Sequence, residues 1–151
     1  MALKVGDQAP GFELPDQNGQ TVSLGDLIDK GPVVVYFYPA ALTPGCTKES
    51  CHFRDLSSEL AGLGASCVGI SADPVDKQKR FDTTHSLGFP LLSDPDHKVA
   101  DSFGVKRSVG FLPNKRATFV IDGRGIVRDV ITSEINMNVH ADRSIEILRG
   151  L

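Results

Sequence analysis

The residues most suited to chemistry in this chain of 151 residues are its three cysteines, Cys46, Cys51 and Cys67. An odd and small number of cysteines does not fit the disulfide framework of a small secreted protein. The four histidines show no metal-ligand spacing, and no Cys-x-x-Cys motif accompanies them, so a zinc site is not expected. No glycine-rich phosphate loop and no Gly-x-Ser-x-Gly turn is present either. We therefore expect no metal and no cofactor, and sulfur as the reactive element.

Cys46 stands where a buried strand ends, a Pro44-Gly45 turn intervenes and a helical pattern begins. The first turn of a helix has unpaired backbone N–H groups and the positive end of the helix dipole, and both favour a thiolate over a thiol. The carboxyl end of a central strand is also where open α/β sheets place their sites. Thr43 offers a nearby hydroxyl that can donate one hydrogen bond and accept another. From position alone, the alternative is that Cys46 is a small buried apolar residue.

A strand and a helix must position Cys46. The continuous apolar run Val33–Tyr38, which Pro39 ends, predicts a central strand buried on both faces. A helix is predicted to begin at about Cys46 and to end at Gly62 and Gly64. Its apolar residues recur at i, i+3, i+7 and i+10, the spacing of one helix face: Phe53, Leu56, Leu60 and Leu63.

Strands and helices alternate along the rest of the chain. Short strands are predicted at 12–14, 21–24, 66–71, 89–92, 116–121 and 126–131, with hairpin turns at 16–19 and 122–125. Helices are predicted from an Asp73-Pro74 cap to about 85, from 94 to 103, and over about 141–148. This order predicts one α/β domain, residues 1–151, with a central mixed β-sheet flanked by helices and an N-terminal β-hairpin extension.

Composition restricts the partners that we expect. The formal charge of −3 gives no basic footprint for nucleic acid or for an anionic membrane. The longest apolar run, Val33–Tyr38, is far shorter than the ~20 residues that a bilayer requires, and no secretory signal core is visible. We therefore expect a cytoplasmic protein without nucleic-acid or membrane partners. No apolar patch for a dimer is evident, so a monomer is expected, with a weak homodimer as the alternative.

The residues around Cys46 carry a resemblance to a known family. The run Pro39-Ala-Ala-Leu-Thr43-Pro-Gly-Cys46 resembles the Pro-x-x-x-Thr-x-x-Cys signature of peroxiredoxins. The longer stretch FYPAALTPGCTKESCHFRD is similar to the bacterioferritin comigratory protein, or peroxiredoxin Q, subfamily. The same resemblance includes VGDQAPGFELPDQNG, VGISADP and RATFVIDGRGIV, and so covers nearly the whole chain.

The resemblance implies a thioredoxin-like fold and reduction of hydrogen peroxide and organic hydroperoxides, with thioredoxin or a glutaredoxin-like protein as reductant. It implies that Cys46 is the peroxidatic cysteine and that Pro39 and Thr43 complete its motif. Arg116 matches the family's active-site arginine, whose permanent charge and fork of donors suit the charge that develops on the leaving oxygen. Glu49 takes a position where the subfamily tends to carry glutamate and could hold Arg116 in place. Its alternative role is that of an ordinary glutamate favoured by the helix dipole.

Cys51 is the candidate for resolving the sulfenic acid that forms on Cys46. Its Cys-x-x-x-x-Cys spacing is found in part of the subfamily, which implies an intramolecular Cys46–Cys51 disulfide. Five residues of helix turn through about 500°, so Cys51 points roughly 140° away from Cys46. Their Cα atoms would lie about 8–9 Å apart in a regular helix, beyond the ~7 Å that a disulfide bridges. The helix must therefore unwind locally before the bond can form.

Cys67 lies within a predicted strand, where a buried small residue is the favoured interpretation, although a resolving role stays open. Two other functions also stay open. A thioredoxin-type disulfide oxidoreductase would need a second cysteine at position 49, which is Glu49, and a proline where Ala117 stands. A non-enzymatic redox sensor would use Cys46 only as a switch, and the sequence separates it poorly from a peroxidase.

The chain departs from the subfamily pattern at two places. Ala40 and Ala41 stand where charged or polar residues are frequent, which implies a more apolar rim at the peroxide entrance. The segment Val105–Lys115 is shorter than in many members, so the loop before Arg116 is expected to differ in shape.

Overall fold

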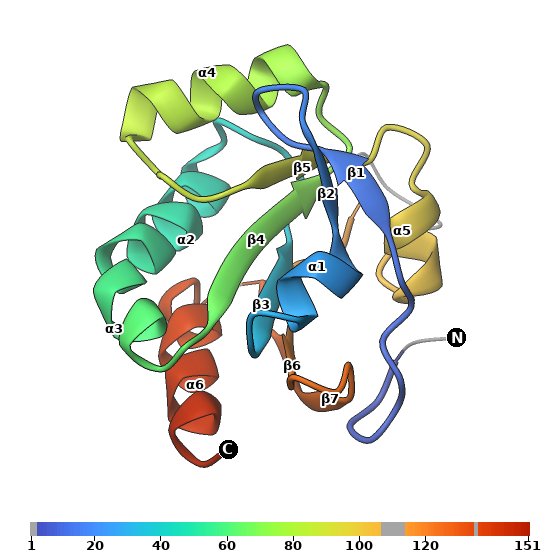
Figure 1. Ribbon diagram of the computed structural model, residues 1–151. Coiled ribbons are helices and arrows are strands. Elements are labelled where there is room, and N and C mark those ends of the chain that lie inside the picture. Colours follow the sequence, from blue (N-terminus) through green and yellow to red (C-terminus); the bar gives the residue numbers. More distant parts are fainter. Residues whose placement is uncertain (1–2, 107–113, 135) are drawn as a thin grey trace.

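A five-stranded mixed sheet forms the centre of the molecule in a computed structural model that describes residues 3–106, 114–134 and 136–151 (Figure 1). The strand order is β5-β4-β3-β6-β7. β3, β4 and β5 are parallel, β6 is antiparallel to β3, and β7 is antiparallel to β6. The central strand contains only Val, Tyr and Phe and is fully buried, as expected for a strand packed on both faces. The strand bounds are Val33–Phe37 (β3), Ser66–Ser71 (β4), Leu91–Ser93 (β5), Ala117–Ile121 (β6) and Val127–Thr132 (β7).

Helices cover both faces of this sheet (Figure 1). One face packs against α2 (Pro44–Asp55), α3 (Ser57–Gly62), α4 (Val75–His85) and α6 (Asn138–Arg149). The other face packs against α1 (Leu24–Ile28), α5 (Lys98–Ser102) and the antiparallel hairpin of β1 (Glu13–Pro15) and β2 (Thr21–Ser23). The prediction of a mixed sheet flanked by helices, with an N-terminal β-hairpin extension, is therefore confirmed.

The strand directions bring four distant segments to one edge of the sheet. Phe37, the last residue of β3, lies opposite Ile70 near the end of β4. It also lies opposite Ala117, the first residue of β6, which in turn pairs with Thr132 at the end of β7. The segments after β3, after β4, before β6 and after β7 therefore meet at this edge.

Two details differ from the sequence predictions. The helix predicted from Cys46 to Leu63 is interrupted at Leu56, whose backbone (φ −98, ψ 10) separates α2 from α3. The apolar periodicity continues across the break, since both Phe53 and Leu60 are buried, and it therefore gave no sign of the interruption. Asp73 does not cap α4, because its carboxylate is used elsewhere and Pro74 takes the capping position.

Of the two places where the chain departs from the subfamily pattern, the structure describes the first and leaves out most of the second. Ala41 is buried, so it does not contribute to a surface rim, whereas Ala40 is half-buried. The short segment Val105–Lys115 falls largely on residues 107–113, which lie outside the described residues.

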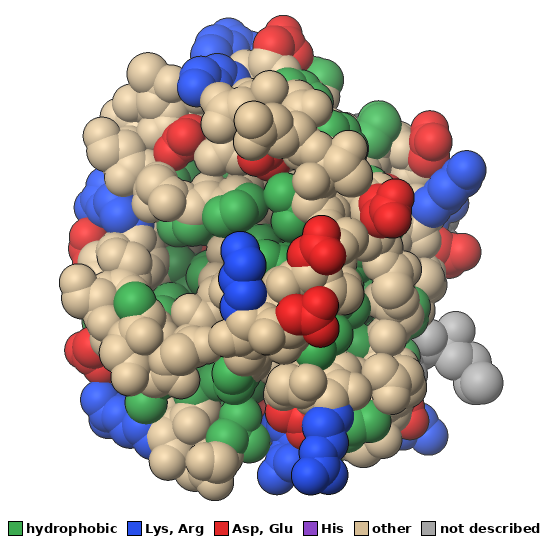
Figure 2. All heavy atoms as spheres, viewed as in Figure 1, with side chains coloured by type: hydrophobic (Ala, Val, Ile, Leu, Met, Phe, Trp, Pro, Cys, Tyr) green, Lys and Arg blue, Asp and Glu red, His purple; other side chains and the backbone are tan. Residues whose placement is uncertain are grey.

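The surface mixes charges of both signs. On the face seen in Figure 2, Lys and Arg side chains are interspersed with Asp and Glu side chains. No helix among residues 3–106, 114–134 and 136–151 combines the length and the apolar character needed to cross a membrane. Large exposed apolar side chains in the described part of the chain are scattered: Val5, Leu42 and Leu151.

Candidate active site

Cys46 is the third residue of α2 and is fully buried. The helix begins where the sequence predicts a start, because Thr43 is extended at the N-cap and Pro44 occupies the first helical position, where its fixed φ and missing N–H are tolerated. Pro39, which ends the buried strand, is also buried. Cys46 packs in the apolar cluster that includes Tyr36 and Phe53. Burial alone fits either a structural or a reactive cysteine, so its polar contacts decide between them.

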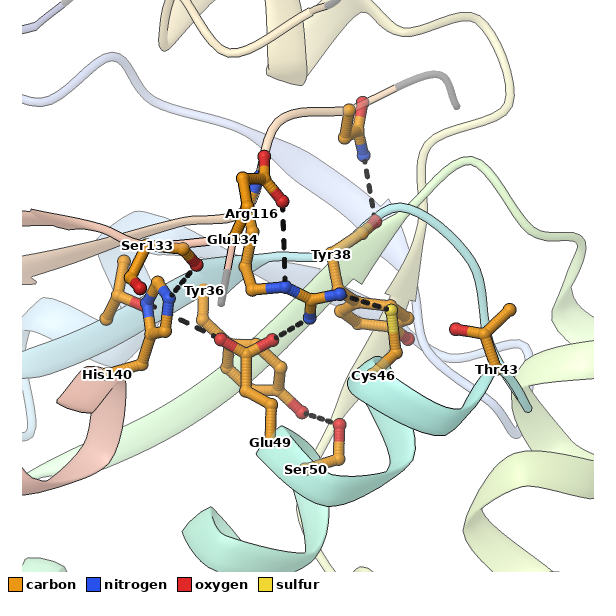
Figure 3. Close-up of polar contacts among 12 residues, drawn as sticks. Tyr36, Tyr38, Thr43, Cys46, Glu49, Ser50, Arg116, Ser133, Glu134 and His140 are labelled. Atoms are coloured by element: carbon orange, nitrogen blue, oxygen red, sulfur yellow. Dashed lines mark hydrogen bonds and ion pairs between the residues drawn. The ribbon is translucent and has the colours of Figure 1, made fainter. Parts of the chain in front are cut away.

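The guanidinium of Arg116 joins Cys46 to Glu49 (Figure 3). Nη2 donates to Sγ of Cys46 at 3.3 Å, and Nη1 donates to Oε1 of Glu49 at 2.7 Å. Arg116 directly precedes β6 and is only 7% exposed. Burial lowers the pKa of Arg116, but the charges of Glu49 and Cys46 outweigh it and raise that pKa overall. A buried, permanently charged donor therefore faces the sulfur.

Glu49 lies one turn after Cys46 and is completely buried. Burial raises the pKa of Glu49 to about 8, although the nearby Arg116 opposes this shift. Of the two roles left open by the sequence, contact with Arg116 is the one that the geometry supports. Oε2 of Glu49 faces His140 of α6, whose Nδ1 lies 3.4 Å away.

His140 was not singled out from the sequence as a site residue. It is fully buried, and burial lowers its pKa. Its ring contacts the Thr118 hydroxyl through Nδ1 at 2.8 Å and the Ser133 carbonyl through Nε2 at 2.9 Å (Figure 3). One signal was present in the sequence: His140, Ser144 and Leu148 share the inward face of α6 at i, i+4 and i+8, so two polar residues stand on the buried face of the helix.

The Thr43 hydroxyl does not donate to the sulfur. Oγ1 donates to the carbonyl oxygen of Ala40 at 2.7 Å, within the loop that leads to the helix. The hydroxyl oxygen nevertheless lies on the side of Thr43 that faces Cys46 (Figure 3). Because the hydroxyl proton is donated to the Ala40 carbonyl, Oγ1 can act only as a hydrogen-bond acceptor for a group in the site.

A buried hydrogen-bond network, also missed in the sequence, anchors the loop before Cys46. The Ala41 amide donates to Oδ2 of Asp73 at 2.7 Å, and the Ser71 hydroxyl donates to the same oxygen at 2.7 Å. Gln78 donates to the Ser71 hydroxyl at 3.0 Å and accepts a hydrogen bond from Tyr38 at 2.5 Å. The end of β4 and the start of α4 thus hold the backbone of the loop in place.

Leu42 occupies a strained position between these anchors. Its φ of 65° lies in the left-handed region, which costs a non-glycine residue roughly 1–2 kcal/mol. Ala41 is held by Asp73 on one side of it, and Thr43 is held by its own hydroxyl on the other. The loop is therefore kept in a conformation that would relax if either anchor were released.

All three cysteines are free thiols. Cys51 is half-buried and lies in the same continuous helix as Cys46. The separation predicted for their Cα atoms in a regular helix therefore applies. Cys67 is buried in β4, opposite Val34 of β3, and burial raises its pKa. The described residues contain no group of three His, Cys, Asp or Glu side chains arranged to hold a metal ion.

Comparison with known proteins identifies related chains over nearly the full length. The sequence model of the AhpC/TSA family matches residues 5–130. The crystal structure of peroxidoxin BcpB from Mycobacterium tuberculosis is 54% identical, with a TM-score of 0.94, and the match covers 99% of this chain and 98% of that one. Chloroplastic peroxiredoxin Q of Populus jackii is 42% identical over 147 residues, which cover 97% of this chain and 68% of the relative.

A more distant solved structure belongs to a protein whose reaction is described. The bacterioferritin comigratory protein of Xanthomonas campestris, described for its alkyl peroxide reduction activity, is 28% identical, with a TM-score of 0.84. The match covers 92% of this chain and 90% of that one.

Proposed function

Since the chain belongs to the AhpC/TSA family and has the thioredoxin-like fold of peroxiredoxins, which are thiol peroxidases, we propose that Cys46 is its peroxidatic cysteine. The observation that carries this assignment is the hydrogen bond from Nη2 of Arg116 to Sγ of Cys46 at 3.3 Å, in a buried site at the start of a helix. A structural cysteine needs no such donor. A cation and a helix N-terminus both stabilise a thiolate, which is the nucleophilic form of cysteine.

The thiolate attacks one oxygen of the hydroperoxide, so that a sulfur–oxygen bond forms while the oxygen–oxygen bond breaks. The departing oxygen becomes water or an alcohol, and Cys46 becomes a sulfenic acid. Arg116 faces the sulfur and is placed to stabilise the charge that develops on the departing oxygen. Oγ1 of Thr43 accepts the O–H of the incoming hydroperoxide, because its own proton is donated to Ala40.

Organic hydroperoxides are proposed as substrates beside hydrogen peroxide. The alkyl peroxide reduction described for the Xanthomonas campestris relative supports this proposal. Exposed Leu42 supplies an apolar side chain in the loop next to Thr43, where an alkyl group could pack.

Cys51 resolves the sulfenic acid by forming a disulfide with Cys46. The first turns of α2 must unwind for this step, because a regular helix holds the two Cα atoms about 8–9 Å apart. Relaxation of the strained backbone at Leu42 favours that unwinding. Cys67 is a weaker candidate, since it is buried in the sheet and burial keeps its thiol protonated.

Peroxiredoxins act on peroxides and are typically reduced by thioredoxin-type proteins, which attack the exposed disulfide. A glutaredoxin-like reductant is the alternative. We further propose that the protein works as a monomer, since the exposed apolar residues among those described are scattered. Three free thiols favour a reducing compartment such as the cytoplasm.

A coupled assay tests the assignment. Peroxide consumption is followed with thioredoxin, thioredoxin reductase and NADPH, for wild-type protein, Cys46→Ser and the matched control Cys67→Ser. Wild-type and Cys67→Ser proteins are expected to consume hydrogen peroxide and an organic hydroperoxide, whereas Cys46→Ser is expected to be inactive. Substantial turnover by Cys46→Ser would refute the assignment. Oxidation of Cys46 without catalytic turnover would instead favour the redox sensor.

The resolving step needs a separate experiment. In Cys51→Ser, we expect Cys46 to react once with peroxide at the wild-type rate but to lose recycling by thioredoxin. Mass spectrometry of oxidised wild-type protein should find the Cys46–Cys51 disulfide, and hydrogen exchange over residues 46–52 should increase on oxidation. Equal protection in both states, with that disulfide present, would show that the helix does not need to unwind.

A further inference from the structure

The carboxyl group of Glu49 is hydrogen-bonded on one side only. Oε1 accepts from Arg116, whereas Oε2 is buried and has no hydrogen-bond partner in the described part of the chain. Nδ1 of His140 lies 3.4 Å from Oε2, and both side chains are completely buried (Figure 3). A buried carboxylate oxygen without a donor is costly, so the protonation of this pair matters.

The partners of His140 fix its hydrogens. The Ser133 carbonyl can only accept, so Nε2 must carry a hydrogen. In a neutral ring Nδ1 is then an acceptor with a single lone pair, for which the Thr118 hydroxyl at 2.8 Å and a protonated Oε2 of Glu49 at 3.4 Å are the two available donors. Nδ1 and an ionised Oε2 would face each other as two acceptors. The contact is favourable only when a proton lies between them, carried by Glu49 or by His140.

Burial and the surrounding charges decide which residue carries the proton. Burial lowers the pKa of His140, and Arg116 lowers it further. Burial raises the pKa of Glu49 to about 8, against the opposing effect of Arg116, and Glu134 adds to the rise. The neutral form of both residues therefore places the proton on Oε2 of Glu49. The ionisable groups that face this pair come from every packed element: Cys46, Arg116, Glu134, Tyr36 of β3 and Cys67 of β4.

We propose that Glu49 and His140 together hold a proton while Cys46 is a thiolate, and that Glu49 releases this proton when Cys46 is oxidised. The inference rests on the proposed role of Cys46. With Glu49 neutral, Arg116 and the thiolate balance each other. Oxidation removes the thiolate charge, and an ionised Glu49 then restores the balance. The net charge of this buried site stays at zero throughout, which avoids the cost of an unpaired buried charge.

The step balances in atoms, electrons and charge. The Cys46 thiolate, the hydroperoxide ROOH and the carboxylic acid of Glu49 give the Cys46 sulfenic acid, the alcohol ROH and the Glu49 carboxylate. The sulfur is oxidised and the peroxide is reduced, as the sulfur–oxygen bond forms and the oxygen–oxygen bond breaks. The electron pair of the broken bond leaves on the alkoxide, which takes up the proton that Glu49 releases.

Two residues that contact the pair, Arg116 and Ser133, also line a surface cavity. It has a volume of about 400 Å³ and is lined by Lys115, Arg116, Thr132, Ser133 and Glu134. Arg116 contacts Glu49, and Ser133 contacts His140, so the cavity lies beside the pair. His140 acts as a positioning residue, since it acts on the site through its contact with Glu49.

Difference infrared spectroscopy of reduced and peroxide-treated protein tests this inference. We expect the C=O stretch of a protonated carboxyl to disappear on oxidation of Cys51→Ser protein, which stops at the Cys46 sulfenic acid and does not unwind α2 into the disulfide, and to be absent from Glu49→Gln in both states. Glu134→Gln is the matched control for a nearby carboxyl. It should show the band in the reduced state and lose it on oxidation. In Cys46→Ser, which has no thiolate to balance Arg116, Glu49 should be ionised and the band should be absent with and without peroxide.

His140 is tested by titration. In reduced wild-type protein the band should disappear as the pH rises through about 8, as expected for the raised pKa of Glu49. In His140→Phe the acceptor of the Glu49 proton is lost, so the band should shift in frequency and titrate at a different pH. Identical bands and titrations in His140→Phe and wild-type protein would remove His140 from the pair.

Mass spectrometry of the same samples separates the two proposals. If Cys46 is oxidised and no carboxyl band is lost, the proton inference is wrong while the peroxidatic assignment stands. If peroxide leaves Cys46 unmodified, the peroxidatic assignment itself fails.

Discussion

Two buried polar groups flank the loop between β3 and α2, and they are built differently. The charge cluster consists of Cys46, Glu49, Arg116 and His140, and it leaves Oε2 of Glu49 and Nε of Arg116 without hydrogen bonds in the described structure. The loop-anchoring network consists of Tyr38, Ser71, Asp73 and Gln78, together with the Ala41 amide.

No buried side-chain atom of the loop-anchoring network lacks a hydrogen bond among the described residues. A satisfied network is rigid and specifies one conformation, whereas a group with unmet hydrogen bonds responds to any change of charge beside it. The difference indicates that the network holds the loop in position and that the cluster carries the reactivity.

Arg116→Ala should have the largest effect, because it removes the donor that faces the sulfur. Loss of one preorganised donor to a developing anion typically costs about 10²–10³-fold in rate. The sulfur of Cys46 should also react more slowly with alkylating agents, since its hydrogen-bond donor is lost. Stopped-flow peroxide kinetics and alkylation rates measure the two effects. Arg143→Ala removes a half-exposed arginine paired with Asp129 and is the control. Similar peroxidase rates in the two variants would show that the charge cluster does not carry the reactivity.

The pH dependence of stability is the next largest effect. Folded Glu49 keeps its proton up to a pH of about 8, whereas the unfolded chain loses it near the ordinary pKa of 4.5. At Glu49 the folded state therefore binds more protons between these values, and the contribution of Glu49 to stability falls as the pH rises through them, at up to about 1.4 kcal/mol per pH unit. In chemical denaturation from pH 5 to 8, stability should therefore change with pH more negatively in wild-type protein than in Glu49→Gln, where the contribution of Cys46 remains and that of Glu49 is lost. Parallel curves would contradict the prediction.

Asp73→Ala tests the network. It leaves the Ala41 amide and the Ser71 hydroxyl without their shared acceptor, which should cost about 1–3 kcal/mol of unfolding free energy. The peroxidase rate should also fall, by about tenfold, because a loosened loop misplaces Thr43 and Cys46. Lys77→Ala removes only the half-exposed ion pair with Asp73 and should change both quantities little. Equal effects of the two substitutions would show that the amide contact is unimportant.

Tyr38→Phe should have the smallest effect. It deletes the hydroxyl that donates to Gln78, which is linked to the Ala41 amide only through Ser71 and Asp73, and should cost about 1 kcal/mol of stability. The peroxidase rate should stay at the wild-type value, because the Ala41–Asp73 contact is kept. A rate loss as large as that of Asp73→Ala would mean that the network acts as one catalytic unit with the cluster.

Much of the charge cluster could be predicted from the sequence, because its geometry follows from local rules. The apolar run of β3 and the Pro44-Gly45 turn place Cys46 at a helix start, and the i, i+3 spacing brings Glu49 to the same side. Arg116 required the resemblance to a family, since only the antiparallel register of β6 with β3 brings it to Cys46.

The remaining contacts depend on tertiary packing. Asp73 has the pattern of a helix cap, and the competing contact with the Ala41 amide arises only when the ends of β3 and β4 lie side by side. His140 meets Glu49 only because α6 packs against α2. The proton of Thr43 could point in either direction until the loop conformation fixed its acceptor.

Both thiols of the proposed cycle lie on one helix of one chain, which has a consequence for how the protein behaves on dilution. The two sulfurs are linked by a few residues, so their effective concentration is set by the chain and reaches the millimolar range whatever the amount of protein. Disulfide formation is then first-order and needs no second molecule. The protein should resolve its sulfenic acid as fast at a few copies per cell as when it is abundant, whereas a cycle closed between subunits would slow once the subunits dissociate.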